Sequence, residues 1–199
     1  MSFIRTLVAA MMLAAAISVS AVQAAQAQGS TVMVIDDNKI FLDSKAGKDI
    51  QTKLQNIEKQ INNELEPTRK SLETEIKALQ PKLEGKTREA IAADTALVNE
   101  LAAFQKKNNE LNQKRAIAER EYAMTAEKAI IDFNNALDPV LTEVIREKNA
   151  QVVLLKSQVV FSADAVDATA AVIQKLDAKT AAIAVTRQKL PAAAPQGGN

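Results

Sequence analysis

Gly47 and Lys48 come nearest to a catalytic motif, the phosphate-binding loop of nucleotide-binding proteins. The first glycine of that loop would fall at Leu42, and the position that should hold a hydroxyl side chain holds Asp49. We therefore interpret this segment as the first turn of a helix.

Acidic residues offer a second candidate, a calcium-binding loop that begins at Asp36. Phe41 stands where such a loop requires glycine, so the acidic run is better interpreted as the polar end of a strand. The chain has no Cys and no His, which excludes disulfides, thiol catalysis and the histidine-dependent hydrolases. Neither a Ser-x-x-Lys dyad nor a Gly-x-Ser-x-Gly turn is present. We expect no enzyme activity, no cofactor and no metal.

The composition favours long helices. Of 199 residues, 25% are charged and only 3% are aromatic, and Gly and Pro number five each. Sandwiches and barrels need more turn residues and more aromatic or β-branched residues. The formal net charge is +1, so the chain lacks the basic field with which proteins bind nucleic acid.

Residues 1–27 have the order of a secretory signal peptide. A basic residue, Arg5, precedes an apolar stretch over 7–19, and small residues allow cleavage after Ala24 or Ala27. The apolar stretch is shorter than the roughly 20 residues of a membrane span, although an uncleaved N-terminal anchor is the alternative. Removal of the segment takes away one basic residue and no acidic one, so the exported chain carries 24 of each.

The next segments predict a strand and a long helix. Val32 and Val34 lie in an apolar run over 31–35 that is typical of a buried strand. Ser44 is a suitable N-cap for a helix over 45–83, in which apolar residues recur every three or four positions. Pro67 should kink this helix, because proline leaves a backbone carbonyl unpaired.

Pro81 and Gly85 fall close together and predict a reversal near residues 80–87. A second helical pattern over 87–148 follows, and helices joined by a short turn pack antiparallel. Asn108 and Arg115 occupy core positions of its seven-residue repeat and weaken the seam. Together with kinks at Pro67 and Pro81, this predicts a flexible arm over residues 45–137, which leucine at Asn108 and Arg115 should stiffen.

The C-terminal part predicts two more strands, at 151–155 and 159–161, which include Val152, Leu154 and Val160. A helix from an N-cap at Asp167 to about Val185 should follow. Residues 186–199 have the low-complexity composition of a disordered tail.

The fold class that results is α+β, mostly α, with a long antiparallel coiled-coil hairpin on a small body of residues 28–44 and 138–185. Three short strands leave apolar edges that must be covered. We therefore predict an oligomer whose subunits share the sheet, through contacts of Val32, Val34, Val152, Leu154 and Val160.

Three segments of the chain resemble segments of one known protein family. They read VMVID over 32–36, IFLDSKAGK over 40–48, and VVLL over 152–155 followed by DAVDATAAVI over 164–173. Together with the export signal and the charged hairpin, they resemble the OmpH/Skp family of periplasmic chaperones, over the mature chain up to about Lys179.

The resemblance implies a jellyfish-shaped homotrimer in the periplasm, in which a β body trimerises and three arms enclose a cavity. Family members hold unfolded outer-membrane β-barrel proteins there and use no ATP. The partners expected are such unfolded proteins and further copies of this chain, with a weak contact to the membrane surface and no nucleic acid.

One departure from the family is the charge. The resemblance implies a strongly basic protein, whereas the exported chain is neutral. We therefore do not predict the lipopolysaccharide-binding site of basic family members for this chain. The alternative function is a structural or adaptor coiled coil of the cell envelope that holds no client. An enzyme is the remote third hypothesis.

Overall fold

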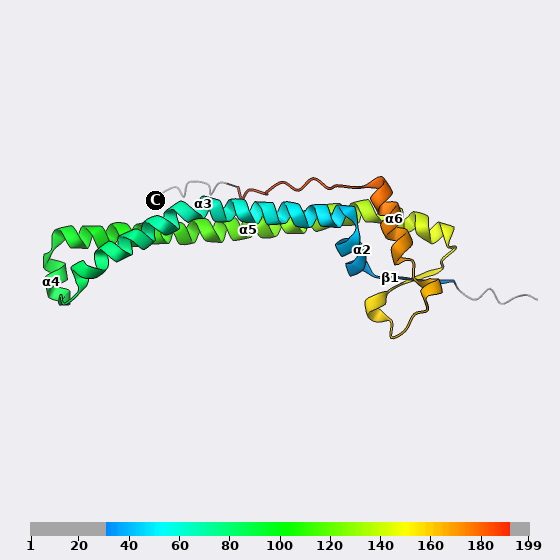
Figure 1. The fold of residues 1–199 in the computed structure, drawn as a ribbon, viewed down its shortest axis with the longest axis horizontal. Coiled ribbons are helices and arrows are strands. Elements are labelled where there is room, and N and C mark those ends of the chain that lie inside the picture. Colours follow the sequence, from blue (N-terminus) through cyan, green and yellow to red (C-terminus); the bar gives the residue numbers. More distant parts are fainter. Residues whose placement is uncertain (1–30, 192–199) are drawn as a thin grey trace, which may run out of the picture.

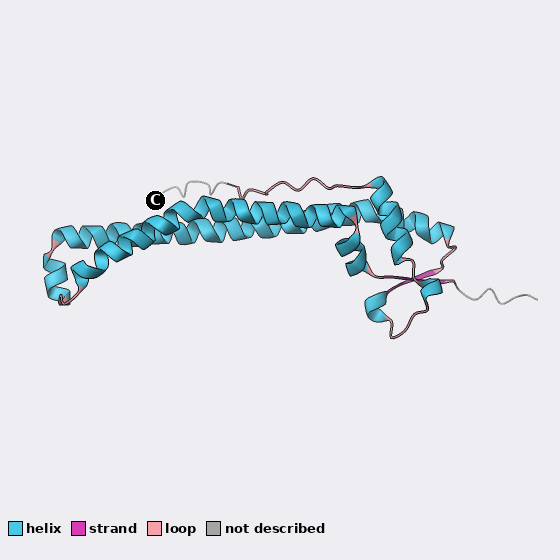
Figure 2. Cartoon of the chain, viewed as in Figure 1, coloured by secondary structure: helices cyan, strands magenta, loops and turns pink. Residues whose placement is uncertain are grey.

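The computed structural model describes residues 31–191, so the predicted signal peptide lies outside the described residues. The molecule is elongated, with a long helical arm at one end and a small body at the other (Figure 1). The arm is helical apart from short loops at its tip, and the strands are confined to the body (Figure 2). Below, the body denotes residues 31–44 and 138–179, and the arm residues 45–137.

The body is built on two parallel strands. β1 (Val32–Ile35) pairs with β2 (Val152–Leu155), with Val32 opposite Val152 and Ile35 opposite Leu155. A single bridge joins Val34 to Asp167. The strands predicted at 31–35 and 151–155 are therefore confirmed.

The third predicted strand, over 159–161, is wrong. The 3₁₀ turn η1 (Lys156–Gln158) directly follows β2, and the next residues carry no strand pairing. The 3₁₀ turn interrupts the extended backbone directly after β2, and the bridge from Val34 to Asp167 occupies the second side of β1 at that residue. Val160 is instead fully exposed and Phe161 is 82% exposed.

Side-chain caps set the junction between body and arm. Asp36 accepts a hydrogen bond from the Lys39 N–H (2.9 Å) and begins α2 (Asp37–Asp43). Ser44 then accepts one from the Gly47 N–H (3.1 Å) and begins α3 (Lys45–Leu83). The N-cap predicted at Ser44 and both ends of this helix are confirmed.

The arm consists of α3 and α5 (Thr95–Glu147), which lie side by side and antiparallel (Figure 1). Helices of 39 and 53 residues span about 58 Å and 80 Å. Pro67 and Pro81 both lie inside α3, which stays helical through them and bends in the half nearer the tip. Proline removes one helical hydrogen bond, and such a bend is its usual result.

The tip departs from the prediction of one unbroken second helix. After a turn at Gly85, whose φ is 72°, the short helix α4 (Arg88–Ala93) precedes α5. Asp94 separates them, because its carboxylate accepts the Leu97 N–H (3.1 Å) and caps α5. An aspartate that hydrogen-bonds the following backbone favours a helix start over a helix interior.

The main core lies where the arm enters the body. Phe133 of α5 packs edge to face against Phe41 of α2, with ring centroids 5.1 Å apart. Around this pair lie fully buried side chains from β1, α2, α3, α5 and α6 (Thr169–Lys179). They include Met33, Ile40, Ile50, Val140, Val144, Val172 and Leu176.

The last predicted helix is shorter than expected. α6 ends at Lys179, and its N-cap position is Ala168. Asp167, the residue before this cap, accepts the Thr169 N–H (2.9 Å). Residues 180–191, which we call the strap, run extended beside the arm (Figure 1). The expected disorder is therefore wrong for residues 186–191, and the rest of the predicted tail lies outside the described residues.

Gly47 marks a close approach of α2 and α3. A Cβ atom there would lie 1.7 Å from the Phe41 carbonyl oxygen. We expect Gly47→Ala to lower the free energy of unfolding by about 1–3 kcal/mol, the usual range for overpacking. Urea unfolding followed by circular dichroism measures this. Lys48→Ala, at an exposed position on the same turn, is the control and should leave the stability nearly unchanged; equal losses in the two variants would contradict the explanation.

Candidate functional site

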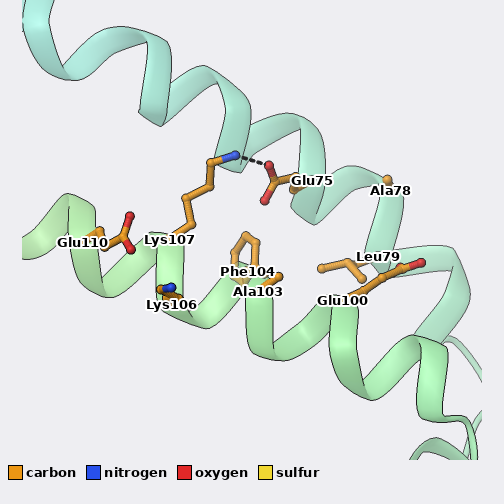
Figure 3. Close-up of a pocket in the computed structure, with 9 residues that line it drawn as sticks. All are labelled: Glu75, Ala78, Leu79, Glu100, Ala103, Phe104, Lys106, Lys107 and Glu110. Carbon is orange, nitrogen blue, oxygen red and sulfur yellow. Dashed lines mark hydrogen bonds and ion pairs between the residues drawn. The ribbon is translucent and has the colours of Figure 1, made fainter.

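Two open hollows lie between α3 and α5. The one nearer the tip has a volume of about 530 Å³ (Figure 3). Leu79 of α3 is almost wholly buried, and Phe104 of α5 is half-buried. The lining mixes small apolar and charged side chains: Glu75, Ala78, Leu79, Glu100, Ala103, Phe104, Lys106, Lys107 and Glu110.

Ion pairs join the two helices at this hollow. Lys107 donates to the Glu75 carboxylate, as Figure 3 shows, and to the Ser71 hydroxyl (2.7 Å). The hydrogen bond from Lys107 lowers the pKa of Glu75 below its ordinary value. Closer to the tip, Lys82 pairs with Glu100 (2.6 Å). Exposed pairs of this kind hold helices together only weakly, so the outer arm is readily deformed.

The second hollow lies nearer the body and has a volume of about 610 Å³. Ile61 and Leu65 of α3 face Ala118 and Tyr122 of α5 across it. Arg115 also lines this hollow and is exposed. Leu72 and Leu111 are buried between the two hollows, so the apolar contact between the helices is interrupted at the hollows and continues between them.

The prediction that Asn108 and Arg115 fill core positions of the seam is wrong, although Arg115 borders the hollow between the two helices. Both residues are exposed, and Lys107 turns toward α3 in place of Asn108. Leu111 and Ala118, seven residues apart, stay buried, so one side of the seam continues while its other side opens at Asn108 and Arg115. Leucine at Asn108 would therefore add exposed apolar surface, whereas leucine at Arg115 would border the hollow between the helices.

α5 also carries apolar side chains on its outward surface. Ile117, Met124 and Ile131, spaced seven residues apart, are 47%, 40% and 51% exposed, and Ile130 is 41% exposed. Residues at this spacing share one helix face, so they form a discontinuous apolar stripe along the inner half of the arm.

The predicted body residues divide into three groups. Val34 is buried within its own chain, and Val32 is half-buried. Val152 and Leu154 are about 40% exposed on β2. Val160 lies in the exposed segment after η1. The apolar surface that one chain leaves open is therefore formed by β2 and residues 159–161.

Glu121 is a buried carboxylate that the sequence analysis missed. Its side chain is 6% exposed and accepts hydrogen bonds from Arg187 Nε (2.9 Å), Lys189 Nζ (3.1 Å) and the Leu190 N–H (3.3 Å). Burial opposes its ionisation, but these donors outweigh burial and lower the pKa of Glu121 below its ordinary value. The sequence signal for a buried carboxylate was a glutamate between Ala118 and Thr125, on the helix face that forms the seam.

Asp167 organises the junction of β1 with α6. Its carboxylate accepts Lys156 Nζ (2.7 Å) and the Thr169 N–H (2.9 Å). The hydrogen bond from Lys156, with those from Thr169, lowers the pKa of Asp167 to about 2.

Within residues 31–191 no cluster of three or more acidic, His or Cys side chains has the arrangement of a metal site. Over the same residues, no helix combines the length and apolar character needed to cross a membrane.

The protein therefore belongs to the structural class in which a helical-hairpin arm projects from a small β body. Open hollows lie along its arm. The family model of outer membrane proteins (OmpH-like) matches residues 31–176, and the chain belongs to that family. The structure is similar to that of a candidate outer membrane chaperone (OmpH-like) from Caulobacter crescentus CB15, with a TM-score of 0.69 and 27% identity. The match covers 81% of this chain and 92% of that one. A search of curated proteins finds no match.

Protonation of Asp167 should make the body less stable as the pH falls through the acidic range. Its pKa of about 2 in the folded protein lies below its ordinary value of 3.8. The carboxylate therefore stabilises the fold above about pH 4 and loses this effect as the pH falls from about 4 to about 2. We expect Asp167→Asn to lower the free energy of unfolding at pH 6 by about 2 kcal/mol, and by much less at pH 2.5.

Urea unfolding of the wild type and the variant at both pH values tests this. Asp37→Asn, at an exposed body carboxylate, is the control and should show a much smaller difference between the two pH values. An equal effect of Asp167→Asn at pH 6 and pH 2.5 would overturn the assignment.

Proposed function

We propose that this chain is an ATP-independent holdase of the periplasm, which keeps unfolded outer-membrane proteins from aggregating. The observation that carries the proposal is the arm, whose helices leave two open hollows and an exposed apolar stripe. Membership of the OmpH-like family supports a chaperone role. The signal-peptide pattern of residues 1–27 supports export.

The arm suits a client that must be held without being folded. An unfolded barrel protein exposes strands with alternating apolar residues and unpaired edges. The arm offers apolar side chains such as Phe104, Ile61 and Met124, separated by charged residues. Many small contacts of this kind are individually weak, so a client can exchange among them and still leave.

We further propose that the chain acts as a homotrimer whose three arms enclose the client. The support lies in the body. Val152, Val153 and Leu154 of β2 are all more than a third exposed, and Phe161 is 82% exposed. A two-stranded sheet is only marginally stable on its own. Pairing of the exposed β2 edge with further copies of the chain would cover that edge.

Aggregation of an outer-membrane protein tests the holdase directly. A urea-unfolded β-barrel protein is diluted with and without the exported chain, in the absence of nucleotide, and light scattering is recorded. We expect suppression that saturates near one client per three chains. If a folded, helical sample gives no suppression, the holdase is refuted and the structural-adaptor alternative takes its place.

Phe161→Asp tests the trimer. Because Phe161 has little contact within its own chain, the substitution should leave the helical circular dichroism unchanged and convert a sedimenting trimer into a monomer at micromolar concentration. Ile76→Asp, on an arm residue that is 51% exposed, should remain trimeric. A trimer with Phe161→Asp, or a wild-type monomer, would contradict the proposed interface.

A further inference from the structure

The strap occupies a groove along the base of the arm. Ile183 is 7% exposed and joins the main core, while Val185 and Arg187 are half-buried. Between them, Ala184 and Thr186 are exposed. The strap therefore lies in the groove as an extended chain with alternate residues pointing inward.

Side chains of the arm hold the backbone of the strap. Asp49 accepts the Ile183 N–H (3.0 Å), and Lys53 donates to the Ile183 carbonyl (2.7 Å). On α5, Thr125 accepts the Gln188 N–H (2.9 Å). Main-chain contacts of this kind do not depend on the side chains of the bound segment, so the groove can hold segments of many sequences.

One side chain of the strap contacts both helices. Arg187 donates to Glu64 of α3 (2.8 Å) and, through Nε, to Glu121 of α5 (2.9 Å). Burial opposes the charge of Arg187, but Glu64 and Glu121 raise its pKa above the ordinary value. The groove thus selects a basic residue at one position, because two carboxylates converge there.

The strap does not fill the groove. Beside it lie a hollow of about 370 Å³ next to Ile57 and Gln60, and another of about 170 Å³ next to Ala129. The strap also lies beyond residue 176, where the match to the family model ends.

We propose that this groove is a binding site for an extended client segment, and that the strap is its displaceable intramolecular occupant. The segment recognised has alternating small and apolar residues and one arginine or lysine. Strands of barrel proteins alternate in the same way, so this inference rests on the proposed holdase function. A tethered occupant has an effective concentration near the millimolar range, and the site is concealed until a client competes with the strap.

Arg187→Ala tests the proposal, because it loosens the strap and leaves Glu64 and Glu121 in the groove. A fluorescent peptide with the sequence of residues 180–191 is titrated into the exported chain, and its anisotropy is recorded. We expect binding about tenfold tighter to Arg187→Ala than to the wild type, the factor of roughly one charge-assisted hydrogen bond. A matched peptide with alanine at the position of Arg187 should lose this gain.

Three further variants complete the experiment. Gln188→Pro removes the N–H that Thr125 accepts and should also tighten peptide binding, without a change of charge. The double variant Arg187→Ala/Glu121→Ala damages the groove and should bind no better than the wild type. Lys77→Ala breaks an exposed pair with Glu73 far from the strap and should behave as the wild type. Circular dichroism confirms that each is folded.

Equal peptide affinity of the wild type, Arg187→Ala and Gln188→Pro would overturn the inference and leave the strap as a permanent clamp. The light-scattering experiment on the same samples separates the two proposals. Suppression without peptide binding refutes the groove and keeps the holdase. Peptide binding without suppression keeps the groove as a peptide site but refutes both the holdase and the assignment of the groove to clients.

Discussion

The parallel pairing of β1 with β2 is the constraint on which the rest of the structure depends. β1 ends at Ile35 and β2 begins at Val152, so the pairing closes a loop of more than a hundred residues. Closure of such a loop costs about 4 kcal/mol in chain entropy, and eight paired strand residues do not supply this alone. The arm must return the chain to its starting point, and the core around Ile50, Phe133 and Val144 must hold it there.

The energetic character of the arm changes along its length. Near the body, α3 and α5 share the main core, and the strap ties them together through Arg187. Toward the tip, the apolar contacts are interrupted by hollows, and ion pairs such as Lys107 with Glu75 bridge the helices. Regions with few buried contacts open at low free energy, so the arm is rigid at its base and compliant at its tip.

Features that depend on local sequence could be predicted. The bounds of α3 follow from an N-cap at Ser44 and an unbroken apolar period, and β1 and β2 follow from short β-branched runs. Features that depend on a partner far along the chain could not. Whether residues 159–161 pair depends on which sheet edges the rest of the chain leaves open, and whether Asn108 is buried depends on how closely α3 approaches it. The break at Asp94 was readable in principle, because aspartate before a helical pattern is an N-cap signal.

The strap shows most clearly why part of the site was hidden. The sequence predicts helix as far as about Val185 and disorder from residue 186, where the composition offers little apolar area to bury. Order comes from the groove, where Asp49, Thr125 and Glu121 supply hydrogen-bond partners that the strap lacks in isolation. A segment ordered in part by hydrogen bonds to its backbone is replaceable there by another extended chain, since every chain carries the same backbone groups. The property that concealed the strap in the sequence is therefore the one that suits its groove to unfolded clients.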